Sequence, residues 1–308
     1  MSTRKDILIK LLLVLLFFVA TLAEATPTEI EWQVFETVYF KVYHHHKDRQ
    51  LVSILVPFMV EDIESFQKSI ACYPDLQAEI YIVPNRETYH SLTENYSGIV
   101  EFSEAFYQPA TKRIYVRNIN DLKEYSKLRK ILLHEYIHYF IEELYQDIPL
   151  WFNEGMAVYF SNDLSIDREF RYAKDFLLGN TKPLTEMRYQ YPKGQIQWES
   201  FYAKSALAVK YLYTNHREEF YQLWKLSQNN SRFGVGFFRA FSMTEHQFSI
   251  LLEDNLQRRF KIEILLASTG IVWSLLPLVM LIAWVRKKIQ NKKTKRGWIE
   301  IEPKNFTE

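Results

Sequence analysis

The chain has 308 residues, and its 38 basic and 37 acidic residues give a formal net charge of +1, which excludes an overall electrostatic bias toward nucleic acid. Aromatic residues make up 16% of the sequence and glycine occurs only 8 times, so the composition is that of an ordered globular protein and not of a disordered or collagen-like chain. Cys72 is the single cysteine, which excludes an intramolecular disulfide and a four-cysteine zinc site.

Residues 1–25 carry the pattern of a secretory signal peptide. A basic start is followed by an uncharged run from Leu11 to Ala20 and by the small-x-small pattern Ala23-Glu24-Ala25. The uncharged run is shorter than a comfortable bilayer span. We therefore expect a signal peptide over 1–25, with an uncleaved N-terminal anchor as the alternative.

An uncharged segment from Ile264 to Val285 predicts a transmembrane helix over 263–285. A buried core helix is the alternative, but such a helix rarely stays uncharged on all faces over this length. Basic residues follow in the segment 286–308, and the positive-inside rule makes this tail cytoplasmic. We therefore expect a single-pass membrane protein that contacts the lipid bilayer through this helix. Its middle region, 26–260, is then extracytoplasmic, in the periplasm or the extracellular space.

The middle region combines strands with later helices, which indicates an α+β fold in one catalytic domain over 26–260. Alternating apolar residues predict a strand or hairpin over 31–43, and short β-rich runs predict strands over 79–83 and 113–117. Apolar residues at helical spacing predict helices over 51–70, 124–144, 151–160, 199–215, 217–228 and 244–260.

The segment His134-Glu135-Tyr136-Ile137-His138 is the most informative feature of the sequence. Histidines four residues apart lie on one face of a helix, where both imidazoles can bind one zinc ion. Glu135 then points near the open coordination site and can act as a general base toward a zinc-activated water. The alternative is an ion pair on a surface helix. The apolar flanking residues argue against it, because burying two histidines and a glutamate costs several kcal/mol unless a partner compensates them.

Glu154 is the expected third zinc ligand. It lies in an apolar run just after the turn at Pro149, and a short link between two helices places them side by side. Gly155 and Ala157 permit close packing of that second helix. The alternative is a solvated glutamate at a helix start, where the helix dipole favours negative charge. A catalytic zinc needs three protein ligands and an open position, and His134, His138 and Glu154 meet that need.

These two helices resemble the gluzincin metallopeptidases and, more narrowly, the bacterial peptidase MA-like domains. The HExxH helix and the W-x-x-E-G-x-A pattern between Pro149 and Ala157 carry the resemblance. It implies a zincin-like fold, with a twisted sheet over an active-site helix and a helical lower part, and zinc-dependent hydrolysis of peptide bonds. It also implies Tyr202 as a catalytic residue, whose hydroxyl stabilises the oxyanion.

One position departs from the pattern of several gluzincins. They carry an acid four residues after the third ligand, where it supports the first histidine, and this chain has Val158 there. Tyr159 and His216 are weaker candidates for the role of Tyr202. The run His44-His45-His46 is a weak metal candidate, because adjacent residues of a strand point to opposite faces.

We therefore expect a zinc metallopeptidase in which His134, His138 and Glu154 hold the metal and Glu135 is the general base. Its expected partner is a peptide or protein substrate and not a nucleic acid, and the sequence leaves the oligomeric state open. A catalytically silent zinc-binding scaffold or binding module is one alternative. A structural membrane protein with an incidental histidine pair is the other.

Overall fold

The computed structural model describes residues 31–93, 104–117, 125–192, 195–227 and 231–299. The chain forms two compact units, 1–143 and 144–308, which are treated separately below. The expected signal peptide over 1–25 lies outside the described residues, as does the end of the basic tail, 300–308. The described part contains both a mixed sheet and many helices, so the predicted α+β class is confirmed.

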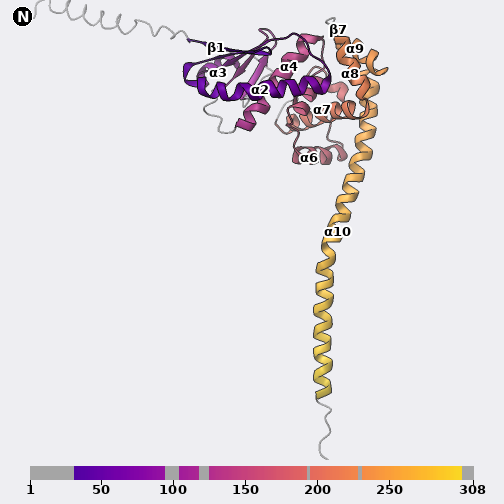
Figure 1. The fold of residues 1–308 in the computed structure, drawn as a ribbon. Helices are drawn as coiled ribbons and strands as arrows, with labels where there is room; N and C mark the ends of the chain where they lie inside the picture. The colour runs from indigo at the N-terminus through magenta and orange to yellow at the C-terminus, as the bar shows by residue number, and fades with distance from the viewer. Residues whose placement is uncertain (1–30, 94–103, 118–124, 193–194, 228–230, 300–308) are drawn as a thin grey trace, which may run out of the picture. The chain divides into compact units, whose positions relative to one another are not determined.

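A mixed five-stranded sheet organises the first unit, which Figure 1 draws from indigo to magenta. Its strand order is β1-β2-β3-β5-β4. β1 and β2 form an antiparallel hairpin, β2, β3 and β5 run parallel, and β4 is an antiparallel edge strand. The strands are β1 (Gln33–Glu36), β2 (Phe40–His44), β3 (Ala78–Ile82), β4 (Ala105–Gln108) and β5 (Arg113–Val116). The three strand predictions are confirmed, whereas β4 was not predicted.

One face of this sheet is covered by α2 (Arg49–Ile70) and α4 (Tyr125–Leu144). Side chains alternate along a strand, so every second residue of β2 and β3 turns toward these helices. The shared core is apolar: Val42, Ile80, Val116, Val52, Met59 and Leu132 surround the same small gap. The sheet therefore packs directly against the helix that carries the HEYIH segment.

The opposite face carries a second, aromatic cluster. Tyr89 of α3 (Arg86–Thr93) packs with Val83, Phe106 and Tyr115. The sequence predicted only a turn at this point. The helix forms because a polar segment with one tyrosine gains a buried partner surface on the sheet, which intrinsic propensity does not reveal.

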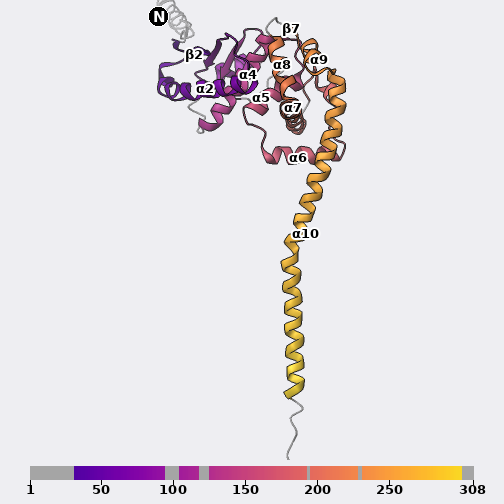
Figure 2. The ribbon, with the colours of Figure 1, turned by 45° about the vertical axis from the view of Figure 1, so that its right-hand side comes forward.

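The second unit is helical, and α7 contacts α5, α6 and α8 within it (Figure 2). Trp151 and Phe152 of α5 are buried, and their rings pack against Phe248 at 5.6 Å and Phe233 at 4.5 Å between centroids. The described elements are β6 (Tyr145–Gln146), α5 (Leu150–Phe160), α6 (Ile166–Leu177), η3 (Leu184–Met187), α7 (Gln195–Asn215), α8 (Arg217–Leu226), β7 (Ser231–Arg232), α9 (Phe233–Phe241) and α10 (Glu245–Ile299).

The structure corrects the expected transmembrane helix over 263–285. Its residues belong to α10, and among the helices of the described residues none is long and apolar enough to cross a membrane. The expected single-pass location, with an extracytoplasmic middle region and a cytoplasmic tail, depended on that helix and is corrected with it.

α5 and α7 approach each other most closely at Gly155. A Cβ atom at this position would lie 2.3 Å from the backbone oxygen of Ser205 and 2.8 Å from Cγ2 of Val209. The first distance is to main chain, which cannot turn aside as a flexible side chain can. Only glycine therefore permits this packing. Glu154 is the neighbouring residue, so it lies beside a close contact between the two helix backbones.

Gly155→Ala should lower the free energy of unfolding by about 3 kcal/mol or more, because the added methyl pushes α5 off the backbone of α7. Denaturant unfolding measures the change. Gly234→Ala is the matched control, since its nearest neighbour, Glu245 Oε1, lies at an ordinary 3.5 Å and alanine is favoured in helices by about 1 kcal/mol. A Gly155→Ala protein as stable as the wild type would contradict the close helix contact.

Candidate metal centre

The HEYIH segment lies in the middle of α4, which is buried on most of its faces. His138 is buried and His134 is half-buried, and their ring centroids lie 4.8 Å apart with a nearly perpendicular angle of 79°. The four-residue spacing therefore places both imidazoles on one face of the helix, as the sequence predicted.

Glu135 is buried beside the first histidine. Its Oε2 accepts a hydrogen bond from the backbone N–H of Tyr107, on the edge strand β4, at 2.7 Å. A hydrogen bond to an ionised group contributes about 1.5–3 kcal/mol, so this contact fixes the orientation of the carboxylate. The sheet edge thereby determines where the expected general base points.

Two phenols at this junction of β4 and α4, those of Tyr107 and Tyr139, pack against each other at 6.1 Å between centroids and remain neutral near neutral pH. Burial, reinforced by the charge of Glu143, raises the pKa of Tyr139 to about 12. Burial and the nearby Glu142 likewise raise the pKa of Tyr107.

Glu154 is buried in α5, with 4% of its surface exposed. Its Oε1 accepts a hydrogen bond from the hydroxyl of Tyr191 at 2.7 Å. Removing a carboxylate from water is costly unless hydrogen bonds or cations compensate it. Glu154 is therefore a buried, hydrogen-bonded carboxylate. It is not the solvated glutamate at a helix start that was the alternative.

His134, His138 and Glu154 together could hold a metal ion, because the ligand atoms that they offer all lie within 4.8 Å of one another. Ligand atoms of a tetrahedral zinc ion lie about 2.0–2.2 Å from it and hence roughly 3.5 Å apart, so side-chain movements of about 1 Å would bring these donors to one ion. The donor set of two imidazoles and one carboxylate fits a divalent transition metal. The structure thus brings together the three residues that the sequence selected as ligands.

Tyr202, the expected oxyanion donor, is half-buried on α7. Its ring packs against Trp198 at 5.5 Å and Phe201 at 6.2 Å between centroids. A second tyrosine, Tyr191, donates its hydroxyl to Oε1 of Glu154 at 2.7 Å. Tyr191 was missed by the sequence reasoning, because it lies in a loop 37 residues beyond its partner and no spacing rule connects the two.

The weaker candidates lie elsewhere in the described chain. Tyr159 packs against Tyr213, and the ring of His216 packs against Tyr211 and Phe241. His44 is buried, with its Nδ1 at 2.9 Å from the carbonyl oxygen of His45. None of these residues belongs to the metal-ligand group found among the described residues.

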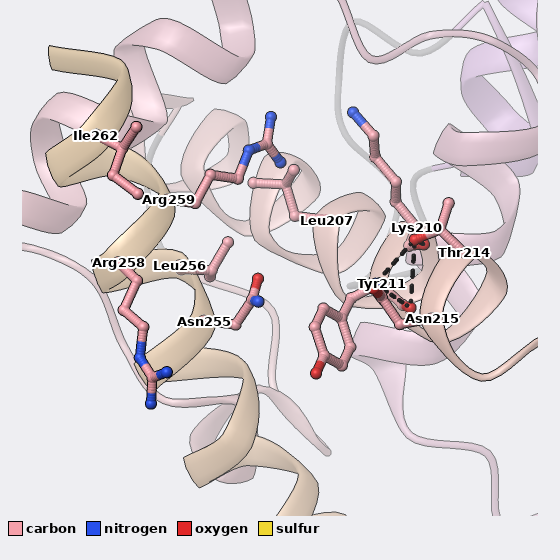
Figure 3. A pocket seen from close by; sticks show the side chains of 10 residues that line it. All are labelled: Leu207, Lys210, Tyr211, Thr214, Asn215, Asn255, Leu256, Arg258, Arg259 and Ile262. Carbon is pink, nitrogen blue, oxygen red and sulfur yellow. Dashed lines mark hydrogen bonds between the residues drawn. The ribbon is translucent and has the colours of Figure 1, made fainter. Parts of the chain in front are cut away.

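A cavity of about 500 Å³ between α7 and α10 is separate from this group (Figure 3). Its cationic lining residues already have carboxylate partners: Lys210 and Arg259 pair with Glu169, and Arg258 pairs with Asp254. The cavity therefore presents no concentrated positive charge to a ligand, and the metal-ligand group remains the candidate site.

Comparison of the sequence with protein-family models and with curated proteins finds no match in either set. The candidate metal centre therefore rests on the residues and geometry of this chain.

His138→Ala should abolish the retention of a divalent metal ion on dialysis, because it removes one of the three candidate ligands; zinc serves as the probe. We expect about one zinc ion per wild-type chain after dialysis, measured by elemental analysis, and none in the variant. Saturating zinc at about 100 times its Kd should also stabilise the wild type by about 2.7 kcal/mol, and not the variant.

The matched control is His246→Ala, which removes an exposed histidine of α10 outside the ligand group. It should retain the wild-type zinc content. Equal zinc content in the His138→Ala and wild-type proteins would remove His138 from the site.

Proposed function

We propose that the chain is a zinc-dependent metallopeptidase that hydrolyses peptide bonds. The observation that carries the proposal is the group of half-buried His134 with buried His138 and Glu154, whose ligand atoms lie within 4.8 Å of one another, and Glu135 next to the first histidine. Three protein ligands leave a position open for a reactant, which is the arrangement of catalytic zinc sites. Structural zinc sites, in contrast, are usually closed by a fourth protein ligand.

The choice of zinc follows from the donor set. Two imidazole nitrogens and one carboxylate oxygen suit zinc better than calcium or magnesium, which prefer oxygen ligands alone. When bound, zinc supplies a Lewis acid and lowers the pKa of a coordinated water to about 7.

Glu135 is the general base of the proposed reaction. Its carboxylate takes the proton from the attacking water and then delivers it to the amine that leaves as the peptide bond breaks. The Tyr107 N–H holds Oε2 of this carboxylate at 2.7 Å and so prevents it from rotating freely. A positioned base of this kind contributes a factor of about 10²–10⁴ to the rate.

The resemblance of the α4 and α5 segments to gluzincins supports the same reaction. The W-x-x-E-G-x-A pattern places its glutamate in the ligand group and its glycine at the close contact with α7. Glu154 and Gly155 therefore each have a structural role, which a chance match to the pattern would not explain.

A catalytically silent zinc-binding scaffold is the second candidate. Val158, which is 1% exposed, occupies the position at which several gluzincins carry a supporting acid. An apolar side chain at this position cannot supply the hydrogen bond that the acid provides in those enzymes.

Glu135→Gln should retain zinc and lower the rate of peptide hydrolysis by about 10²–10⁴-fold, because the amide cannot accept the proton. The measurement is cleavage of a denatured-protein or peptide library by the purified full chain, with zinc content determined in parallel. Glu143→Gln is the matched control on the same helix, since Glu143 pairs with Lys112 at 2.6 Å and lies outside the ligand group.

A Glu135→Gln protein that cleaves at the wild-type rate would overturn the proposed mechanism. Failure of the wild-type chain to cleave any member of the library, with zinc bound and the fold intact, would favour the silent scaffold.

A further inference from the structure

The loop segment 188–191 contacts α5 at two points, one helical turn apart. The backbone N–H of Leu150, at the start of α5, donates to the carbonyl oxygen of Arg188 at 2.9 Å. The hydroxyl of Tyr191 donates to Oε1 of Glu154 at 2.7 Å. Leu150 and Glu154 are four residues apart and share one face of the helix, so the segment lies along that face as a strap.

Ion pairs on both sides anchor this strap at its first residue. The guanidinium of Arg188 pairs with Asp147 at 3.1 Å and with Glu245 at the start of α10. It also donates to the carbonyl oxygen of Asp147 at 3.2 Å. Arg188 and Glu245 each expose only 19% of their side chains, so this pair is less screened than a surface ion pair. The strap is therefore held independently of its contact with Glu154.

The other end of the strap is fixed by aromatic packing. The ring of Tyr191 stacks on Trp198 of α7, with centroids 4.7 Å apart and planes at 18°, and it contacts Phe201 at 5.8 Å. α7 is also the helix against which Gly155 packs. The Tyr191 ring and the backbone next to Glu154 thus both pack against α7. This shared contact fixes the direction in which the Tyr191 hydroxyl points.

We propose that Tyr191 is a positioning residue of the metal centre, and that its hydroxyl holds the Glu154 carboxylate in the orientation that meets the two imidazoles. The inference depends on the metal centre of the proposed function but concerns metal affinity and not turnover. Hydrogen-bond partners of metal ligands typically set affinity by 10–100-fold, because they remove the rotational freedom of the ligand before the metal arrives.

The test is the zinc affinity of the full chain, measured by competition with a chromogenic chelator. Tyr191→Phe retains the ring that stacks on Trp198 and removes only the hydroxyl, so the metal-free protein should unfold at about the wild-type temperature. Its zinc Kd should rise by about 10–100-fold. Tyr73→Phe is the control: it removes a hydroxyl from an exposed tyrosine outside the strap, and it should leave the Kd unchanged.

A double-mutant cycle distinguishes positioning from a general structural effect. In a Glu154→Ala background, whose two remaining ligands should bind zinc only weakly, the Kd is measured by direct titration at high zinc concentration. Tyr191→Phe should change this weak Kd by less than about twofold, because the carboxylate on which it acts is gone. An equal loss in both backgrounds, or no loss in the wild-type background, would overturn the role of Tyr191 and leave the proposed function standing. Failure of the wild-type chain to bind zinc at all would overturn both.

Discussion

The burial of three polar side chains beside one another is the constraint on which this structure depends. His138, Glu135 and Glu154 each expose 9% or less of their surface, within two helices whose other residues are largely apolar. Taking such groups out of water is unfavourable unless each finds a partner of matching chemistry. Edge-strand backbone, a phenol and the ligand group itself supply those partners, and a divalent cation would satisfy the remaining demand of two imidazoles and a carboxylate.

The helical unit provides Glu154 and also fixes the position of its carboxylate. Glu154 sits one residue before a glycine that leaves no room for a side chain, and Tyr191 stacks on the helix that forms the other half of that contact. The position of the carboxylate is therefore set by backbone-to-backbone packing. Its rotation is set by one hydroxyl.

The parts of the structure that the sequence predicted are those with a local signal. The apolar periodicity of α2 and the β-rich runs of β3 and β5 reveal buried faces, and the HEYIH spacing reveals a shared helix face. β4 was missed because a four-residue strand is defined by its partner β5, and α9 because two glycines lower its helix propensity until packing overrides it. Tyr191 carries no such local signal, because its hydrogen bond to Glu154 depends on the tertiary contact between its loop and α5. α10 also runs on past the predicted boundary near residue 260, since no breaker interrupts the helix there.

The order of the site residues along the chain has a consequence for how a nascent polypeptide acquires its metal. All three ligands belong to one helix–link–helix segment, so bringing them together closes only a short loop and costs little chain entropy. The phenol partner of Glu154 comes 37 residues later, after η3. Any ion that the three candidate ligands bound before η3 and the following loop had folded would lack the hydrogen bond from Tyr191 to Glu154. Completion of the site would therefore wait for the downstream elements.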